Sequence, residues 1–122
     1  MQTSSPVQQT LVNLTPHPLV LLCVTGTQRV HQSGNIARVR HEQVPLDPVA
    51  GIPVFTTAYK DIEGLPEPQD GVTFIVSSLI QHALKQQGID RPDVLSPGTG
   101  PNDSAVKEAG RIVAVTRLMK IQ

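Results

Sequence analysis

The sequence lacks paired cysteines, an excess of charge of either sign and long apolar runs. Cys23 is the only cysteine in the 122 residues, so one chain forms neither an intrachain disulfide nor a cysteine-based zinc site. Ten Lys plus Arg balance ten Asp plus Glu, which argues against the basic surface of a nucleic-acid binder. The longest apolar run, 19–24, is far too short to cross a bilayer. We therefore expect a cytoplasmic protein with neither a nucleic-acid nor a membrane partner.

Aromatic residues are also scarce, at 2% against 39% hydrophobic residues in total. The core is therefore expected to be aliphatic, with Phe74 inside it and with Phe55 and Tyr59 as the only other large rings. The length predicts a single domain over 1–122, in which the polar residues 1–8 fray. Zero net charge favours self-association, so a homo-oligomer is expected.

The first half of the chain predicts short antiparallel strands. Residues 9–15 and 19–24 are β-rich on either side of a turn with Pro16 and Pro18, which predicts a hairpin between them. Ile36 to Arg40 alternates apolar and basic residues, as an edge strand does. Pro45, Pro48 and Pro53 are expected to break the next stretch, leaving one more short strand at 52–58.

The second half predicts one helix between two strands. Val72 to Val76 is apolar on both faces from Phe74 onward, which predicts an interior strand. Ser78 is placed to cap a helix over about 78–87 whose Gln81 reaches back to the cap. Leu79, Ile80, Ala83 and Leu84 form its apolar stripe, with Gln81 facing water, and Gly88 ends it. A long strand is predicted from 110 to 121.

The fold class predicted is therefore α+β, with a mostly antiparallel sheet and one main helix. If Val94 and Leu95 pair in parallel with 72–76, the helix is a β-α-β crossover, and the residues after both strands share one sheet edge. A helix N-terminus and a glycine-containing loop at that edge favour binding of an anion such as phosphate. The alternative is that these serines are only caps and the loop is only a turn. The candidate ligand-binding residues are Asn13, His17, Arg38, Ser77, Ser78, Arg91, Ser96, Thr99, Gly100 and Arg111.

The histidines offer little catalytic pattern. Two prolines hold the backbone of His17, which suits a ligand contact or a hydrogen-bonding turn equally. His82 follows Ser78 by one helical turn, but no recognised nucleophile motif accompanies the pair. No metal-ligand spacing appears. We therefore expect neither a metal nor a cofactor, and an enzyme is less favoured than a binding protein.

The chain resembles a family of small bacterial and phage proteins of unassigned function. The resemblance extends over nearly the whole chain and rests on Asn13-Leu-Thr-Pro-His17, Ser33-Gly-x-x-Ala-Arg-Val39, Gly64-Leu-Pro-x-Pro68, Ile75-Val-Ser77, Arg91-Pro-Asp93, Thr99-Gly-Pro101 and Gly110-Arg-Ile-Val. It implies no particular reaction. Some phage proteins of this size sequester nucleotide immune signals as compact homo-oligomers, which is an analogy of functional class only.

Three functions are expected in descending order. The first is a non-catalytic protein that binds a small anionic or nucleotide-like ligand, such as a phage-encoded sponge for a nucleotide-derived immune signal. The second is a structural or protein-interaction module whose recognition surface is the proline-rich stretch from Pro45 to Pro68. The third is a small hydrolase of a nucleotide or phosphate ester that uses Ser77, Ser78 or His17.

Overall fold

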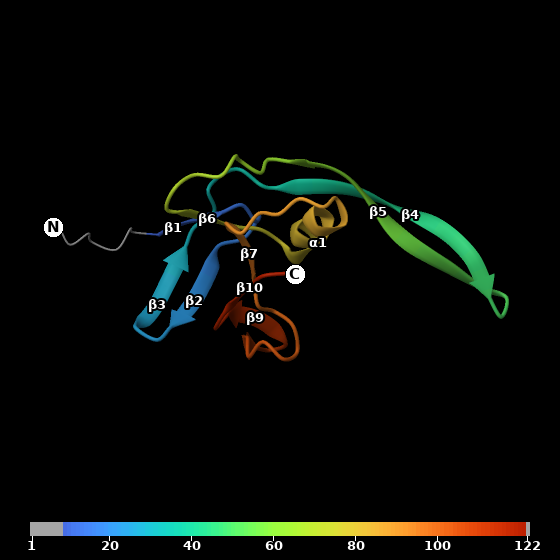
Figure 1. Cartoon of the computed structure of the whole chain (residues 1–122). Helices are drawn as coiled ribbons and strands as arrows, with labels where there is room; N and C mark the ends of the chain where they lie inside the picture. The colour runs from blue at the N-terminus through green and yellow to red at the C-terminus, as the bar shows by residue number, and fades with distance from the viewer. Residues whose placement is uncertain (1–8, 122) are drawn as a thin grey trace.

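A four-stranded sheet forms the centre of the molecule (Figure 1). The computed structural model describes residues 9–121, so the expected fraying of 1–8 lies outside the described residues. The strand order is β1-β6-β7-β10, with bounds Thr10–Asn13, Val72–Ile75, Val94–Pro97 and Leu118–Met119. β1 and β7 both pair in parallel with β6, and β10 adds an antiparallel edge to β7.

Within residues 9–121, three antiparallel hairpins and one helix lie around this sheet. The hairpins are β2–β3 (Leu19–Cys23, Gly26–Val30), β4–β5 (Arg38–Val49, Ile52–Glu63) and β8–β9 (Val106–Glu108, Arg111–Ala114). The helix is α1 (Ser78–Gln86). The predicted α+β class with mostly antiparallel pairing and one helix is confirmed.

The core lies between β6, β7 and α1. Phe74, Ile75, Val76 and Val94 are fully buried, and Phe74, Val76 and Val94 belong to one apolar cluster with Ile80 and Leu84 of α1. The helix adds three buried apolar side chains, those of Ile80, Ala83 and Leu84. A smaller cluster of Leu21, Val30 and Val115 joins the β2–β3 hairpin to the C-terminal segment.

The predicted β-α-β unit is present. Phe74 lies opposite Val94 in a parallel register, and α1 connects the two strands. The helix ends at Gln86 with Gln87 as its C-cap, and Gly88 follows with a φ of 72°, a left-handed conformation that glycine adopts without a steric cost. The predicted range of about 78–87 therefore differs from α1 by one residue.

The predicted hairpin between 9–15 and 19–24 is wrong. β1 pairs in parallel with β6, and β2 instead turns through Val24 and Thr25 to pair with β3. The turn after β1 is held by the side chain of Asn13 rather than by a strand ladder. The local turn signal at Pro16 and Pro18 was correct, but it redirects the chain instead of folding it back on itself.

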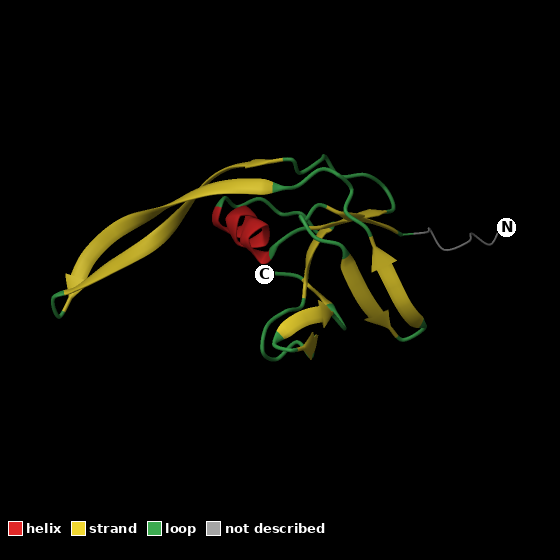
Figure 2. Ribbon diagram, turned by 180° about the vertical axis from the view of Figure 1, so that it is seen from behind, coloured by secondary structure: helices red, strands yellow, loops and turns green. Residues whose placement is uncertain are grey.

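The predicted break at the prolines is also wrong. Pro45 and Pro48 lie within β4 and Pro53 lies within β5, in a hairpin whose strands each contain 12 residues. A two-stranded ribbon has outward-facing edges, where a residue without an N–H is tolerated. This hairpin extends well away from the rest of the molecule, as both views show (Figure 2).

Three predictions about α1 and the C-terminus require correction. Ser77, not Ser78, is the N-cap, and it makes no side-chain capping bond. Leu79 is exposed, whereas Gln81 is only 3% exposed, because its amide bonds groups on β7 and β10. The predicted strand over 110–121 is divided into β9 and β10, since Thr116 and Arg117 turn the chain back toward β7.

Candidate functional site

The parallel register brings the ends of β1, β6 and β7 to one edge of the sheet. The amide of Leu14 donates to the carbonyl of Ile75 at 2.8 Å, and that of Val76 donates to the carbonyl of Leu95 at 2.9 Å. The residues that follow these strands, Ser77 among them, therefore lie at the edge that the sequence pattern indicated.

The side chain of Asn13 is buried at this edge and makes four hydrogen bonds within the chain. Its Nδ2 donates to the carbonyl oxygens of His17 (2.8 Å) and Val30 (3.2 Å). Its Oδ1 accepts from the amide and the hydroxyl of Thr15, at 2.9 and 2.6 Å. With 1% exposure and all of these bonds made, the Asn13 amide stabilises the turn.

The loop after β7 is also folded onto itself. The hydroxyl of Ser96 is buried and accepts from Gln81 Nε2 at 2.6 Å. The amide of Gly100 donates to Asp103 Oδ2 at 2.8 Å, so the chain's own carboxylate occupies one donor of the expected anion cradle. A Cβ on Gly98 would lie 2.7 Å from Arg117 Cγ. The lack of a side chain at Gly98 therefore lets Arg117 pack closely against this loop.

The remaining candidates at this edge are exposed. Ser77, Ser78, Thr99 and His17 all face solvent. Within residues 9–121 no side-chain hydrogen bond joins Ser78 to His82, and no three His, Cys, Asp or Glu side chains are arranged to hold a metal ion. These side chains offer hydroxyl and imidazole groups, but none of them lines the cleft described below.

Arg91 and Asp93 form a bidentate ion pair. The guanidinium Nε and one terminal nitrogen each lie 2.9 Å from a different carboxylate oxygen, and that terminal nitrogen also donates to the carbonyl of Pro66 at 2.8 Å. The Arg91 hydrogen bond is the main reason that the pKa of Asp93 is lowered from 3.8. The pair therefore ties the 64–71 loop to the start of β7.

We expect Asp93→Asn to lower the free energy of unfolding by about 2 kcal/mol at pH 7, because Arg91 loses charge-assisted hydrogen bonds. A lowered folded-state pKa contributes stability that is complete above the ordinary value of 3.8 and is lost as the pH falls through the folded-state value. The difference between the wild type and the variant should therefore shrink in acid. Urea unfolding from pH 7 to pH 3 measures this, with exposed Asp70→Asn as the control; a constant difference would contradict the prediction.

Arg91 also lines a cleft of about 380 Å³. The end of α1, the following loop and the C-terminal segment line it with Gln81, Leu84, Lys85, Gly88, Ile89, Asp90, Arg91, Lys120 and Ile121. Lys120 Nζ donates to the carbonyl of Arg91. Three cationic side chains, those of Lys85, Arg91 and Lys120, and the carboxylate of Asp90 thus border this cleft. Of these four residues, only Arg91 was a candidate from the sequence.

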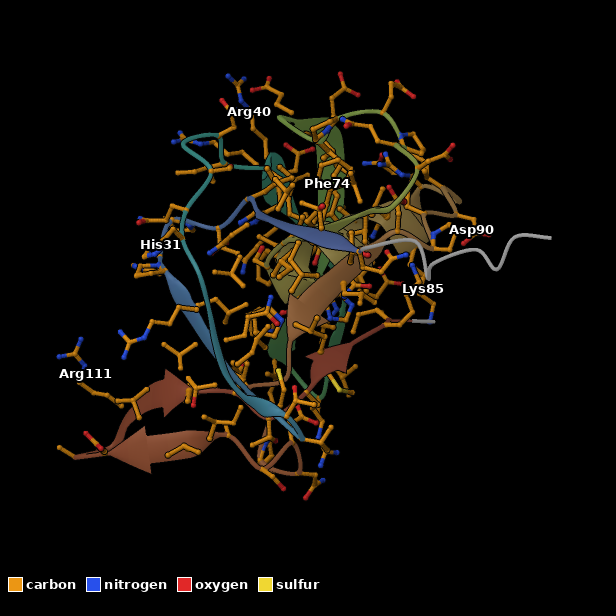
Figure 3. The ribbon with its side chains drawn as sticks, turned by 90° about the vertical axis from the view of Figure 1, so that its left-hand side faces the viewer. His31, Arg40, Phe74, Lys85, Asp90 and Arg111 are labelled. Carbon is orange, nitrogen blue, oxygen red and sulfur yellow. The ribbon has the colours of Figure 1, made fainter. Side chains whose placement is uncertain are left out.

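The other two predicted arginines lie elsewhere. Arg38 begins β4, and Arg111 begins β9. Figure 3 shows Lys85 and Asp90 on the same side of the molecule, with Arg111 far from both. Neither arginine lines the cleft. Lys85 and Lys120 carried no motif, and only their positions after folding, in the last turn of α1 and beyond β10, bring them to Arg91.

No protein-family model matches the chain, and no match is found among curated proteins or solved structures. Among residues 9–121, α1 is too short to traverse a membrane.

Proposed function

We propose that this protein binds a small anionic ligand of the nucleotide-derivative class without converting it, as a sponge for a nucleotide-derived immune signal does. The observation that carries the proposal is the cleft bordered by Lys85, Arg91 and Lys120. Its volume of about 380 Å³ falls within the usual range for small-molecule sites. An ammonium group such as that of Lys120 forms charge-assisted hydrogen bonds with a phosphate group.

Both ends of such a ligand find suitable chemistry in the cleft. Lys120 donates one hydrogen to the Arg91 carbonyl, and an ammonium group has two further donors to offer a phosphate. Leu84, Ile89 and Ile121 supply apolar surface on which a sugar or base can pack. Lys120 is therefore the side chain on which ligand affinity is expected to depend most.

The first test is a calorimetric titration of the full chain with cyclic dinucleotides, ADP-ribose derivatives and inorganic phosphate. For a ligand that binds, Lys120→Met is expected to raise Kd by about 10- to 100-fold, because one charge-assisted hydrogen bond is lost. Lys107→Met, on exposed β8, is the matched control and should leave Kd unchanged. Unaltered affinity in Lys120→Met would remove the cleft from the proposal, and no binding across the panel would refute the function.

Recovered ligand separates binding from catalysis. A binding protein returns the ligand with its mass unchanged after denaturation, whereas a hydrolase acting through Ser77, Ser78 or His17 returns products. A time course over many turnovers with excess ligand makes the distinction independent of affinity.

A second candidate function, protein interaction, is favoured by the exposed β4–β5 hairpin. This hairpin contains most of the proline-rich stretch from Pro45 to Pro68. Its end carries several exposed apolar side chains, which is characteristic of an interaction site.

A further inference from the structure

A side-chain amide of α1 covers one point on the edge of β5. Gln86 Oε1 accepts from the amide of Tyr59 at 3.0 Å, and Gln86 Nε2 donates to the carbonyl of Thr57 at 2.9 Å. In a parallel sheet, one residue bonds its neighbour strand in this pattern, to the carbonyl of one residue and to the amide two positions further on. The Gln86 amide therefore takes the place of a parallel-strand residue opposite Ala58.

The alternation of the backbone shows which other groups of β5 face this edge. In an antiparallel pair, successive residues point their N–H and C=O groups alternately toward the partner strand and away from it. The N–H of Tyr59 points to Gln86, so those of Thr57 and Phe55 also point away from β4. Pro45, which has no N–H, lies opposite Phe55, as expected where two residues exchange no ladder bond.

Four backbone groups line the edge beyond Gln86. They are the amides of Thr57 and Phe55 and the carbonyls of Phe55 and Pro53. Among residues 9–121, no hydrogen bond outside the strand pairs reaches them. The segment 53–57 spans about 13 Å at about 3.3 Å per residue, and Pro53 ends the row because it has no N–H. We call residues 53–57 the β5 edge.

A cavity of about 730 Å³ borders the β5 edge. Figure 2 shows α1 beside the inner part of the hairpin. The two elements line the cavity with Phe55, Thr56, Thr57 and Tyr59 from β5 and with His82, Lys85 and Gln86 from α1. The volume falls within the usual range for binding sites. The hydrogen bonds of Gln86 hold strand and helix together, so this cavity is formed before any ligand arrives.

We propose that the β5 edge binds an extended peptide as a parallel third strand, in line with the Gln86 amide. One peptide residue donates to the carbonyl of Phe55 and accepts from the amide of Thr57. The residue two positions earlier donates to the carbonyl of Pro53 and accepts from the amide of Phe55. A parallel peptide uses all four groups, whereas an antiparallel one would direct a donor at the Thr57 carbonyl, which Gln86 already bonds.

The lining residues define the chemistry of the peptide. Phe55 is 53% exposed and offers an apolar surface to a β-branched side chain of the added strand. Lys85 and His82 form the helical wall, and none of the seven lining residues is acidic. This charge favours aspartate or glutamate over lysine or arginine in the peptide. The partner is therefore a segment of another protein in which acidic and β-branched residues alternate.

The test is a selection from a displayed library of random seven-residue peptides on the full chain. Peptides of the stated composition should be enriched, and their Kd for Thr57→Pro should be at least about 10-fold higher, because one backbone hydrogen bond is lost. Gln43→Pro is the matched control. Gln43 lies opposite Thr57, so this change removes an outward N–H from the other edge of the hairpin and should leave Kd unchanged.

Both variants are expected to keep the hairpin. Native Pro45 and Pro53 already occupy outward-facing positions of the same two strands, and the replaced N–H groups take no part in the ladder. Circular dichroism and thermal unfolding check this. The cleft of the proposed ligand shares only Lys85 with this cavity, so the loss of peptide binding and the loss of ligand binding are separate results.

Hydrogen exchange in the wild type needs no variant. An enriched peptide should slow exchange at the amides of Phe55 and Thr57 and leave that of Gln43 unchanged. A paramagnetic label at the peptide's N-terminus should broaden the Ile52 amide more than that of Lys60, since a parallel peptide runs in the direction of β5.

Four results would each overturn the proposal. They are no enrichment over Thr57→Pro, enrichment of basic peptides, protection at Gln43 in place of Thr57, and broadening in the reverse order. Sedimentation equilibrium adds a fifth. A wild-type dimer that Thr57→Pro converts to a monomer would make a second copy of this chain the occupant of the β5 edge, in place of a peptide from another protein.

Discussion

Replacing Asn13 with aspartate is expected to lower the free energy of unfolding by about 3 kcal/mol or more, because the change leaves unpaired polar groups and a charge in the interior. The Nδ2 atom of Asn13 donates to two carbonyl oxygens, those of His17 and Val30. A carboxylate would place an oxygen there, facing both carbonyls at hydrogen-bond distance. The side chain is 1% exposed, so water does not replace the lost donor.

The measurement is thermal and urea unfolding of Asn13→Asp beside the wild type. For a domain of this length the loss corresponds to a fall in Tm of about 10 °C or more. Asn35→Asp makes the same chemical change at an exposed turn and should alter Tm by no more than about 2 °C. A variant with the stability of the wild type would show that the amide of Asn13 is not what holds the turn after β1.

The central crossover was predictable because its pattern is local. Residues 72–76 are apolar on both faces, a helical stripe follows, and Gly88 ends the helix. Each of these signals depends only on the types and spacing of a few neighbouring residues. The pairing of β1 with β6 joins Thr10 to Val72 across 62 positions, and no local pattern specifies so distant a partner.

The β4–β5 hairpin was hidden for a different reason. Proline usually ends a strand because it lacks an N–H donor, and Pro45, Pro48 and Pro53 predicted three breaks. A ribbon of only two strands leaves half of its backbone groups facing outward, so these residues fit within it. The prolines correctly indicate strands with open edges, but they wrongly predicted that the strands end at these positions.

The sheet edge at which the sequence predicted a site exists, but the cationic cleft does not include the residues predicted there, apart from Arg91. The carboxyl edge of the sheet exists, yet Asn13 and Ser96 use their polar atoms within the fold. The cationic cleft instead joins Lys85 on α1 to Lys120 beyond β10. This cleft forms because the C-terminal segment runs back beside β7 through β10. Neither residue spacing nor hydrophobic periodicity predicts that pairing.

Gln81→Leu is expected to lower the free energy of unfolding by about 2–3 kcal/mol, since it leaves three buried or half-buried groups without their partner. Gln81 Nε2 donates to Ser96 Oγ (2.6 Å) and to the carbonyl of Met119 (2.8 Å), and its Oε1 accepts from the amide of Ile121 (3.0 Å). Leucine has a similar volume, so the change removes hydrogen bonds without opening a large cavity.

Hydrogen exchange distinguishes a local effect of Gln81→Leu from a global one. If this amide anchors the C-terminal segment to α1 and β7, the Ile121 amide should lose protection first, followed by the β7–β10 pair, while β1 and β6 exchange at a rate set by global stability. Gln86→Leu is the matched control on the same helix, because its partners, Thr57 and Tyr59, belong to β5. It should loosen the base of the β4–β5 hairpin and leave Ile121 protected. Loss of protection at Ile121 in both variants would show that the C-terminus depends on the helix as a whole and not on the single side chain that joins them.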